Sequence, residues 1–177
     1  MAGLLAAVVA PSAGAWTSYP RIDDALRHFD SRPDSYVRCL TDDEAASYRY
    51  SPNETSIIYD NGRWVRPGLW LSLDAGVCEE MLGVLDTPAD YLGDAIHNET
   101  AAEQFLVFTH EIGHMRGGKY WRSESRMWCF GINHVRGVMA YMGVPPDTIA
   151  MLWPYVLEQS RLWAYDPYRL LPCRLVS

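Results

Sequence analysis

The stretch TAAEQFLVFTHEIGHM, residues 100–115, is the most apolar helical segment of the chain and the starting point for its fold. Thr100 and Glu103 have the spacing of a capping box, which begins helices, and two glycines shortly after the segment end it. The run FLVF at 105–108 puts large apolar side chains on every side of such a helix, as is typical of a buried helix. We therefore predict a central helix over residues 100–115.

Strand signals precede this helix. Residues 56–59 and 63–65 flank an Asn-Gly pair, which is the strongest short hairpin signal. Residues 69–73 are a third strand candidate, because their leucines alternate and would share one face of a sheet. Asp74 can cap a further helix, whose apolar residues recur at helical spacing as far as Leu85. We expect a small antiparallel sheet that packs against the central helix.

Further helices are expected on both sides of these elements. Capping residues, breakers and apolar spacing place them at residues 23–29, from Thr41 onward, at 124–142, and at 147–163 with an interruption at Pro154. The order is thus a small β-meander with helices around it, followed by a helical half. This order predicts an α+β fold, and the length of the chain suits one domain over residues 16–177.

Composition and charge exclude several classes of protein. Hydrophobic residues make up 49% of the chain and charged residues 21%, so the chain can form its own core and is not expected to be disordered. The net charge is −7 and no basic run is present. We therefore expect no nucleic-acid partner and no binding to an anionic membrane surface.

The first 15 residues, MAGLLAAVVAPSAGA, are typical of the second half of a secretory signal peptide. They combine a short apolar run with Pro11 and with small residues before position 16, although the basic start is missing. The alternative is a flexible N-terminus. The run is too short to span a bilayer, so no stable membrane insertion is expected.

The cysteines also bear on the compartment. Cys39, Cys78, Cys129 and Cys173 are spread along the chain and never form a C-x-x-C pair. This pattern favours two disulfides in an oxidising compartment over a structural zinc site or four buried thiols. With the N-terminal segment, it predicts a secreted or cell-envelope protein.

One motif carries chemistry: His110-Glu111-Ile112-Gly113-His114, which has the form H-E-x-x-H. Residues four apart lie one turn along the same helix face, so His110 and His114 can bind one cation. Neutral imidazoles are zinc ligands, and zinc lowers the pKa of a bound water to about 7. Glu111 is rotated away from the ion but can reach that water and take its proton. The motif therefore predicts Zn²⁺ held by the two histidines, with Glu111 as the general base.

A catalytic zinc site needs a third protein ligand and keeps its fourth position open. Tyr120 stands where the longer H-E-x-x-H-x-x-G-x-x-H pattern has its third histidine, which leaves Glu124 and His134 as downstream candidates. They lie ten residues apart and on different faces of the second helix, so both cannot easily serve one ion. We predict Glu124, with His134 as the alternative. His28 and His97 lack ligand spacing, and we expect surface or capping roles for them.

H-E-x-x-H followed by a helix with Glu at its start resembles the gluzincin branch of the zincin metallopeptidases. The chain also resembles small secreted bacterial proteins of zincin type in residues 37–40, 70–78, 109–117, 124–129 and 165–173. This resemblance covers most of residues 37–173 and implies a minimal zincin-like fold, zinc, and hydrolysis of a peptide or protein. The substrate would add as an extended strand to a sheet edge formed by residues 69–73 or by the hairpin at 56–65. The alternative is that these strands are part of the core.

Two further expectations accompany this fold. The disulfides would be Cys78–Cys129, tying a flanking helix to the metal region, and Cys39–Cys173, closing the ends of the domain. Candidates to stabilise a developing oxyanion are Tyr120, Arg126, His134 and Tyr141, and a structural role is the alternative for each.

Three other functions fit parts of the sequence. A zinc amidase that acts on cell-wall material would use the same residues. A non-catalytic secreted protein would keep zinc as a structural element closed by four protein ligands. A metal-free protein would carry the H-E-x-x-H pattern by chance.

Overall fold

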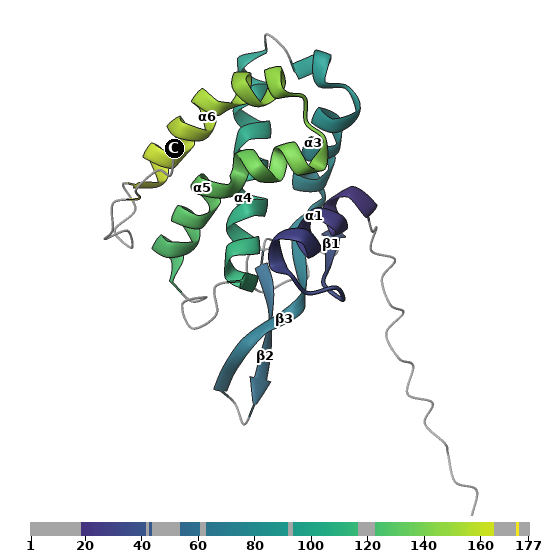
Figure 1. Ribbon diagram of the computed structural model, residues 1–177, viewed down its shortest axis with the longest axis vertical. Coiled ribbons are helices and arrows are strands. Elements are labelled where there is room, and N and C mark those ends of the chain that lie inside the picture. Colours follow the sequence, from purple (N-terminus) through teal and green to yellow (C-terminus); the bar gives the residue numbers. More distant parts are fainter. Residues whose placement is uncertain are drawn as a thin grey trace, which may run out of the picture.

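Helix α4 (Ala95–Arg116) lies at the centre of the molecule (Figure 1). The computed structural model describes residues 19–41, 43, 54–60, 63–91, 94–116, 123–164 and 173. The other α-helices in these ranges all contact α4: α1 (Pro20–Asp30), α3 (Ala75–Asp86), α5 (Glu124–Met142) and α6 (Pro146–Ala164). A short 3-10 helix, η1 (Pro88–Tyr91), follows α3. The predicted central helix is thus confirmed.

The start of α4 differs from the prediction. Asp94 caps the helix, because its Oδ1 accepts hydrogen bonds from the backbone N–H groups of Ile96 at 2.9 Å and His97 at 3.1 Å. Thr100 does not cap a helix; its hydroxyl donates to the carbonyl of Ile96 inside α4 at 3.0 Å. The predicted start at Thr100 was wrong because Asp94 already satisfies the first N–H groups, so the helix forms one turn earlier.

The ends of the other helices mostly follow the sequence signals. Asp74 caps α3 by accepting from the N–H of Gly76 at 2.9 Å, as predicted. Gly143, with φ of 93°, ends α5 at the predicted place, because glycine adopts this left-handed conformation without strain. Helix α6 runs through Pro154, so the predicted interruption was wrong. Proline has no N–H group, so the carbonyl of Ala150 lacks its usual donor at Pro154. Both residues are exposed, and solvent can replace this missing hydrogen bond.

Within the described ranges, the sheet has three strands in the order β1-β3-β2. Strands β2 (Glu54–Asp60) and β3 (Arg63–Asp74) form the antiparallel hairpin that the Asn-Gly pair predicts, and this hairpin extends away from the helices (Figure 1). Strand β1 (Tyr36–Leu40) pairs with the other side of β3 in parallel, with Val37 opposite Leu71.

The expectation of an antiparallel sheet was therefore wrong, since the sheet is mixed. A parallel pair needs a long crossover connection, so no turn signal marks it in the sequence. The start of β1 is fixed instead by α1, because the N–H of Val37 donates to the buried carboxylate of Asp23 at 2.6 Å. β3 is also one strand where two were expected, and its central position means that residues 69–73 cannot form a sheet edge.

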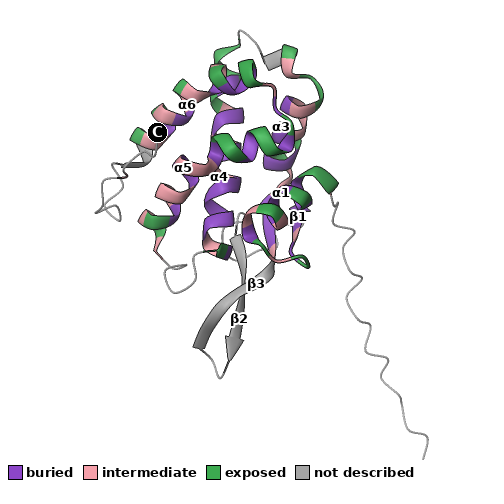
Figure 2. Cartoon of the chain, in the orientation of Figure 1, coloured by how far each residue is buried: buried purple, intermediate pink, exposed green. Residues whose placement is uncertain are grey.

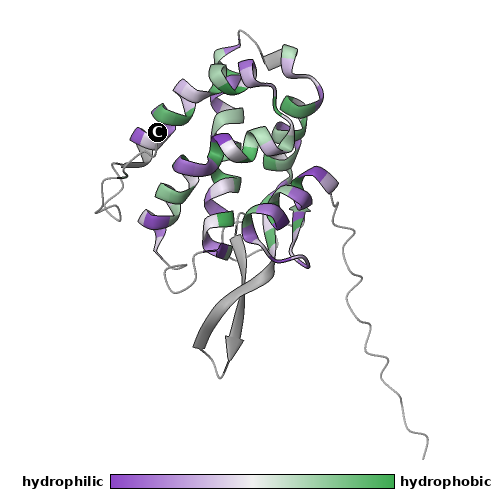
Figure 3. Cartoon of the chain, in the orientation of Figure 1, coloured by the Kyte–Doolittle hydropathy of each residue, from purple (hydrophilic) through white to green (hydrophobic). Residues whose placement is uncertain are grey.

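The core surrounds α4 on several sides. Figure 2 shows much of α4 in the colour of buried residues, and Phe105, Phe108 and Ile112 have no exposed surface. Leu71 and Leu73 of β3 join this core, as their alternation predicts. Figure 3 shows hydrophilic and hydrophobic residues alternating along α1 and α5, which cover α4 with one face and meet solvent with the other.

Both disulfides exist, but with different partners from those expected. Cys39 of β1 is joined to Cys78 of α3, and Cys129 of α5 is joined to Cys173. The parallel pairing explains the first bridge, because Cys39 lies opposite Leu73 and the chain enters α3 directly after β3. This places the two Cα atoms 6.1 Å apart, within the range that a disulfide spans. Two disulfides are consistent with an extracellular location.

Several predictions concern residues outside the described ranges. They are the signal peptide at 1–15, most of the helix expected from Thr41 onward, Tyr120, and residues 165–172. No helix in the described part of the chain has the length and apolar character that crossing a bilayer requires.

Candidate metal centre

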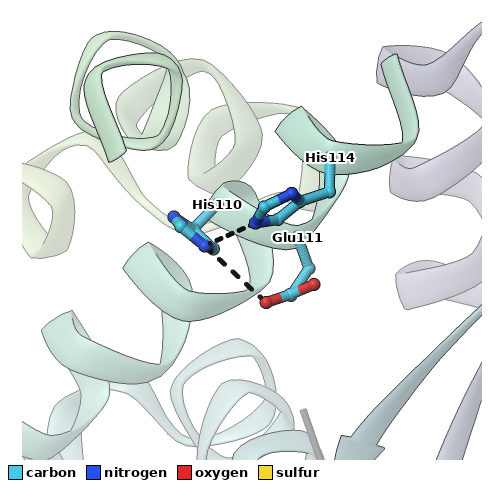
Figure 4. A group of neighbouring side chains, drawn as sticks. All are labelled: His110, Glu111 and His114. Carbon is cyan, nitrogen blue, oxygen red and sulfur yellow. Dashed lines mark hydrogen bonds and ion pairs between the residues drawn. The ribbon is translucent and has the colours of Figure 1, made fainter. Parts of the chain in front are cut away.

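His110 and His114 project from the last turns of α4 and meet at their Nε2 atoms. These atoms lie 2.9 Å apart, and the ring planes are inclined by 73° (Figure 4). The helical spacing alone brings them together, since residues four apart lie on one face. The side chains are 5% and 11% exposed, so both histidines are removed from most of the solvent.

Glu111 lies beside the histidine pair. Its Oε1 is 3.8 Å from Nε2 of His110, and one ligand atom from each of His110, Glu111 and His114 falls within 4.8 Å of the others (Figure 4). The carboxylate is largely buried. The three motif residues therefore converge on one small volume, as the sequence predicts.

Helix α5 brings a second carboxylate to the same place. Glu124 has its Oε2 3.2 Å from Nε2 of His110 and its Oε1 3.4 Å from Nε2 of His114. Hydrogen bonds from His110, and then from His114, hold the pKa of Glu124 well below its usual range. Its side chain is 55% exposed, so the site opens to solvent on this side.

Two glycines allow α5 to approach α4 closely enough for this contact. A Cβ at Gly113 would lie 2.9 Å from Cδ1 of Phe130 and 3.3 Å from Sδ of Met127. A Cβ at Gly131 would lie 3.4 Å from the backbone N and Cα of His110. Gly113 stands at the second variable position of the H-E-x-x-H motif. The same five residues of this chain therefore contain both histidines and a glycine that lets the two helices approach closely.

The donor set and the distances fit a zinc ion. Two histidines and one glutamate are a known set of catalytic zinc ligands, and zinc–nitrogen bonds of about 2.0–2.1 Å at tetrahedral angles put ligand atoms about 3.3 Å apart. The 2.9, 3.2 and 3.4 Å distances among His110, His114 and Glu124 are close to this value. Glu111 is more distant from Nε2 of His110, at 3.8 Å, than Glu124 is, at 3.2 Å, but it too belongs to the group that could hold a metal.

The other histidines named in the sequence analysis make contacts elsewhere. His134 donates from Nδ1 to the carbonyl of Phe130 at 2.9 Å and stacks on the Phe130 ring, so its contacts do not join the His110–His114 pair. His97 is exposed and pairs with the capping residue Asp94 at 3.0 Å, which is a surface role as expected. His28 stacks on Tyr141.

Three of the four oxyanion candidates, Arg126, His134 and Tyr141, lie in the described residues, and Tyr120 does not. Tyr141 lies at the far end of α5, about 25 Å from Glu124 along the helix, so it cannot serve the site. Arg126 is exposed in the first turn of α5, and a role in catalysis stays a prediction for it.

Sequence reasoning missed Trp128. Its ring centroid lies 3.9 Å from that of His110, with the ring planes inclined by 35°. The available signal was its position four residues after Glu124, which puts both on one face of α5.

Comparison of the chain with protein-family models, with curated proteins and with solved structures finds no match.

Proposed function

We propose that this protein is a zinc-dependent hydrolase, and specifically a metallopeptidase. The observation that supports the proposal is the convergence of His110, His114 and Glu124, with the carboxylate of Glu111 beside them. The two disulfides support the further proposal that it acts outside the cytoplasm.

In this mechanism, His110, His114 and Glu124 would hold the metal. Zinc, when bound, supplies a Lewis acid that polarises the scissile carbonyl and lowers the pKa of water. Glu111 takes a proton from the attacking water at a carboxylate oxygen and delivers it to the leaving amine. Its burial beside His110 keeps this oxygen close to the reacting atoms.

The substrate would lie along strand β2. Among the described strands, β2 forms one edge of the sheet and contacts α4, whereas β3 is paired on both sides. An extended peptide could therefore continue the sheet beyond β2 through backbone hydrogen bonds. A peptide whose backbone nitrogens are methylated at alternate positions should then bind more weakly than its unmethylated counterpart.

The deciding experiment compares the wild type with Glu111→Gln. We expect both to bind one zinc ion per chain by elemental analysis, and only the wild type to cleave a peptide library. Glu158→Gln is the matched control, because Glu158 is an exposed glutamate on α6 that pairs only with Arg161 in the contacts described. Equal cleavage by wild type and Glu111→Gln would refute the mechanism. Cleavage of peptidoglycan fragments but not of peptides would identify an amidase.

A further inference from the structure

Among the described residues, Trp128 is an aromatic residue that packs against one of the candidate metal ligands, His110. It lies one turn after Glu124 on α5, and its ring covers one side of the His110 imidazole with 3.9 Å between centroids. The edge of His114 meets the same imidazole with 4.6 Å between centroids. The His110 ring thus contacts two aromatic neighbours, and its side chain is only 5% exposed.

We propose that Trp128 is a positioning residue, which holds the His110 ring for metal binding and favours its metal-bound form. This inference rests on the proposed function, because it concerns the same zinc site. It adds a role for a residue that neither the motif nor the ligand set includes.

Two physical effects support the role. Burial and contact with the Trp128 ring leave the His110 imidazole few orientations, so less freedom is lost when it binds a cation. An imidazole also gains partial positive charge when its nitrogen binds a cation, and the electron-rich face of an indole attracts positive charge. The second effect depends on the π-system of Trp128, so phenylalanine should preserve part of it and an aliphatic side chain none.

The chain offers a matched control for this argument. Trp153 of α6 is also half-buried and also packs against the core, but its ring lies 5.0 Å from the guanidinium of Arg136. Replacing Trp153 therefore removes a similar amount of apolar packing without touching His110. A loss of zinc affinity that follows Trp128 but not Trp153 cannot be attributed to general loosening of the core.

The test measures the dissociation constant of zinc by chelator competition in the wild type and in Trp128→Phe, Trp128→Leu and Trp153→Leu. We expect Trp128→Leu to weaken zinc binding by about 3- to 30-fold, which corresponds to the usual strength of such an aromatic contact. Trp128→Phe should stay within about threefold of the wild type, and Trp153→Leu should bind zinc as the wild type does. Trp128→Met is a second non-aromatic variant in case the leucine variant does not fold, because methionine adapts to irregular gaps.

A second measurement needs no metal. In the metal-free protein, the nuclear magnetic resonance signal of the His110 ring should carry the ring-current shift of the neighbouring indole. This shift should disappear in Trp128→Leu and remain in Trp153→Leu.

The outcomes separate the two proposals. Zinc binding by Trp128→Leu that equals that of the wild type, or an equal loss in Trp153→Leu, overturns the role of Trp128 and leaves the proposed function standing. A wild type that binds no zinc overturns both. An unchanged His110 signal in Trp128→Leu overturns the contact itself.

Discussion

Replacing Gly113 by alanine tests whether the close approach of α4 and α5 builds the site. The new Cβ would lie 2.9 Å from Cδ1 of Phe130 and 3.3 Å from its Cβ, so α5 or the Phe130 ring has to move. The stacked ring of His134, with 4.0 Å between centroids, and the core against which Phe130 packs restrict the movement of this ring. We therefore expect α5 to shift and to carry Glu124 away from the two histidines.

Two opposing effects determine how much each glycine-to-alanine replacement changes the free energy of unfolding. Alanine favours a helix over glycine by about 1 kcal/mol, and overpacking a core costs about 1–3 kcal/mol. Gly137→Ala isolates the first effect, because Gly137 lies in α5 and a Cβ there would meet only Phe29, at an ordinary 3.8 Å. Gly137→Ala should stabilise the protein, and Gly113→Ala should be less stable than Gly137→Ala by about 1–3 kcal/mol.

The measurement is chemical denaturation followed by circular dichroism, with the disulfides intact, together with the dissociation constant of zinc. Gly113→Ala should also bind zinc more weakly than Gly137→Ala. If the two variants gain the same stability and bind zinc equally, the helices do not depend on Gly113 for their approach, and the reasoning is refuted.

Other predictions concern single features of the fold. The pKa of Glu124 is lower in the folded protein than its ordinary value of 4.5, so its ionised form adds stability above that pH. The stability advantage of the metal-free wild type over Glu124→Gln should therefore shrink as the pH falls below that value, and a constant difference would contradict the contact. Pro154→Ala should raise the midpoint of thermal unfolding, because the restored N–H can donate to the carbonyl of Ala150, and a lower midpoint would show that proline is required there. Reducing the disulfides should lower the free energy of unfolding by up to about 4 kcal/mol for each, on the loop-entropy estimate for spans of 39 and 44 residues. Unchanged denaturation after reduction would refute this.

Local signals in the sequence predicted the elements that depend on neighbouring residues. The central helix, the hairpin, the Asp74 cap and the end of α5 at Gly143 all follow from spacing or from single capping residues. The convergence of His110 and His114 is equally local, because one turn of helix fixes it. For these features the chain needs no information from distant segments.

Features that depend on distant segments were missed or wrong. β1 pairs with β3 across more than thirty residues, and the partner of Cys39 follows from that pairing. The contact of Trp128 with His110 depends on how closely two helices pack, which side-chain periodicity does not specify. The placement of Glu124, in contrast, was anticipated, because it begins the helix that follows the reversal of the chain after the metal helix. Its binding of a metal stays a prediction.

The two histidines belong to one helix and the glutamate to another. A cation shared by them would act as a crosslink between α4 and α5, whose connection runs through residues 117–122. Its binding energy would then add to the stability of the folded chain, by about 4 kcal/mol when the free ion is a thousandfold above its dissociation constant. Thermal unfolding in the presence of different divalent ions would therefore rank their affinities without any substrate being known.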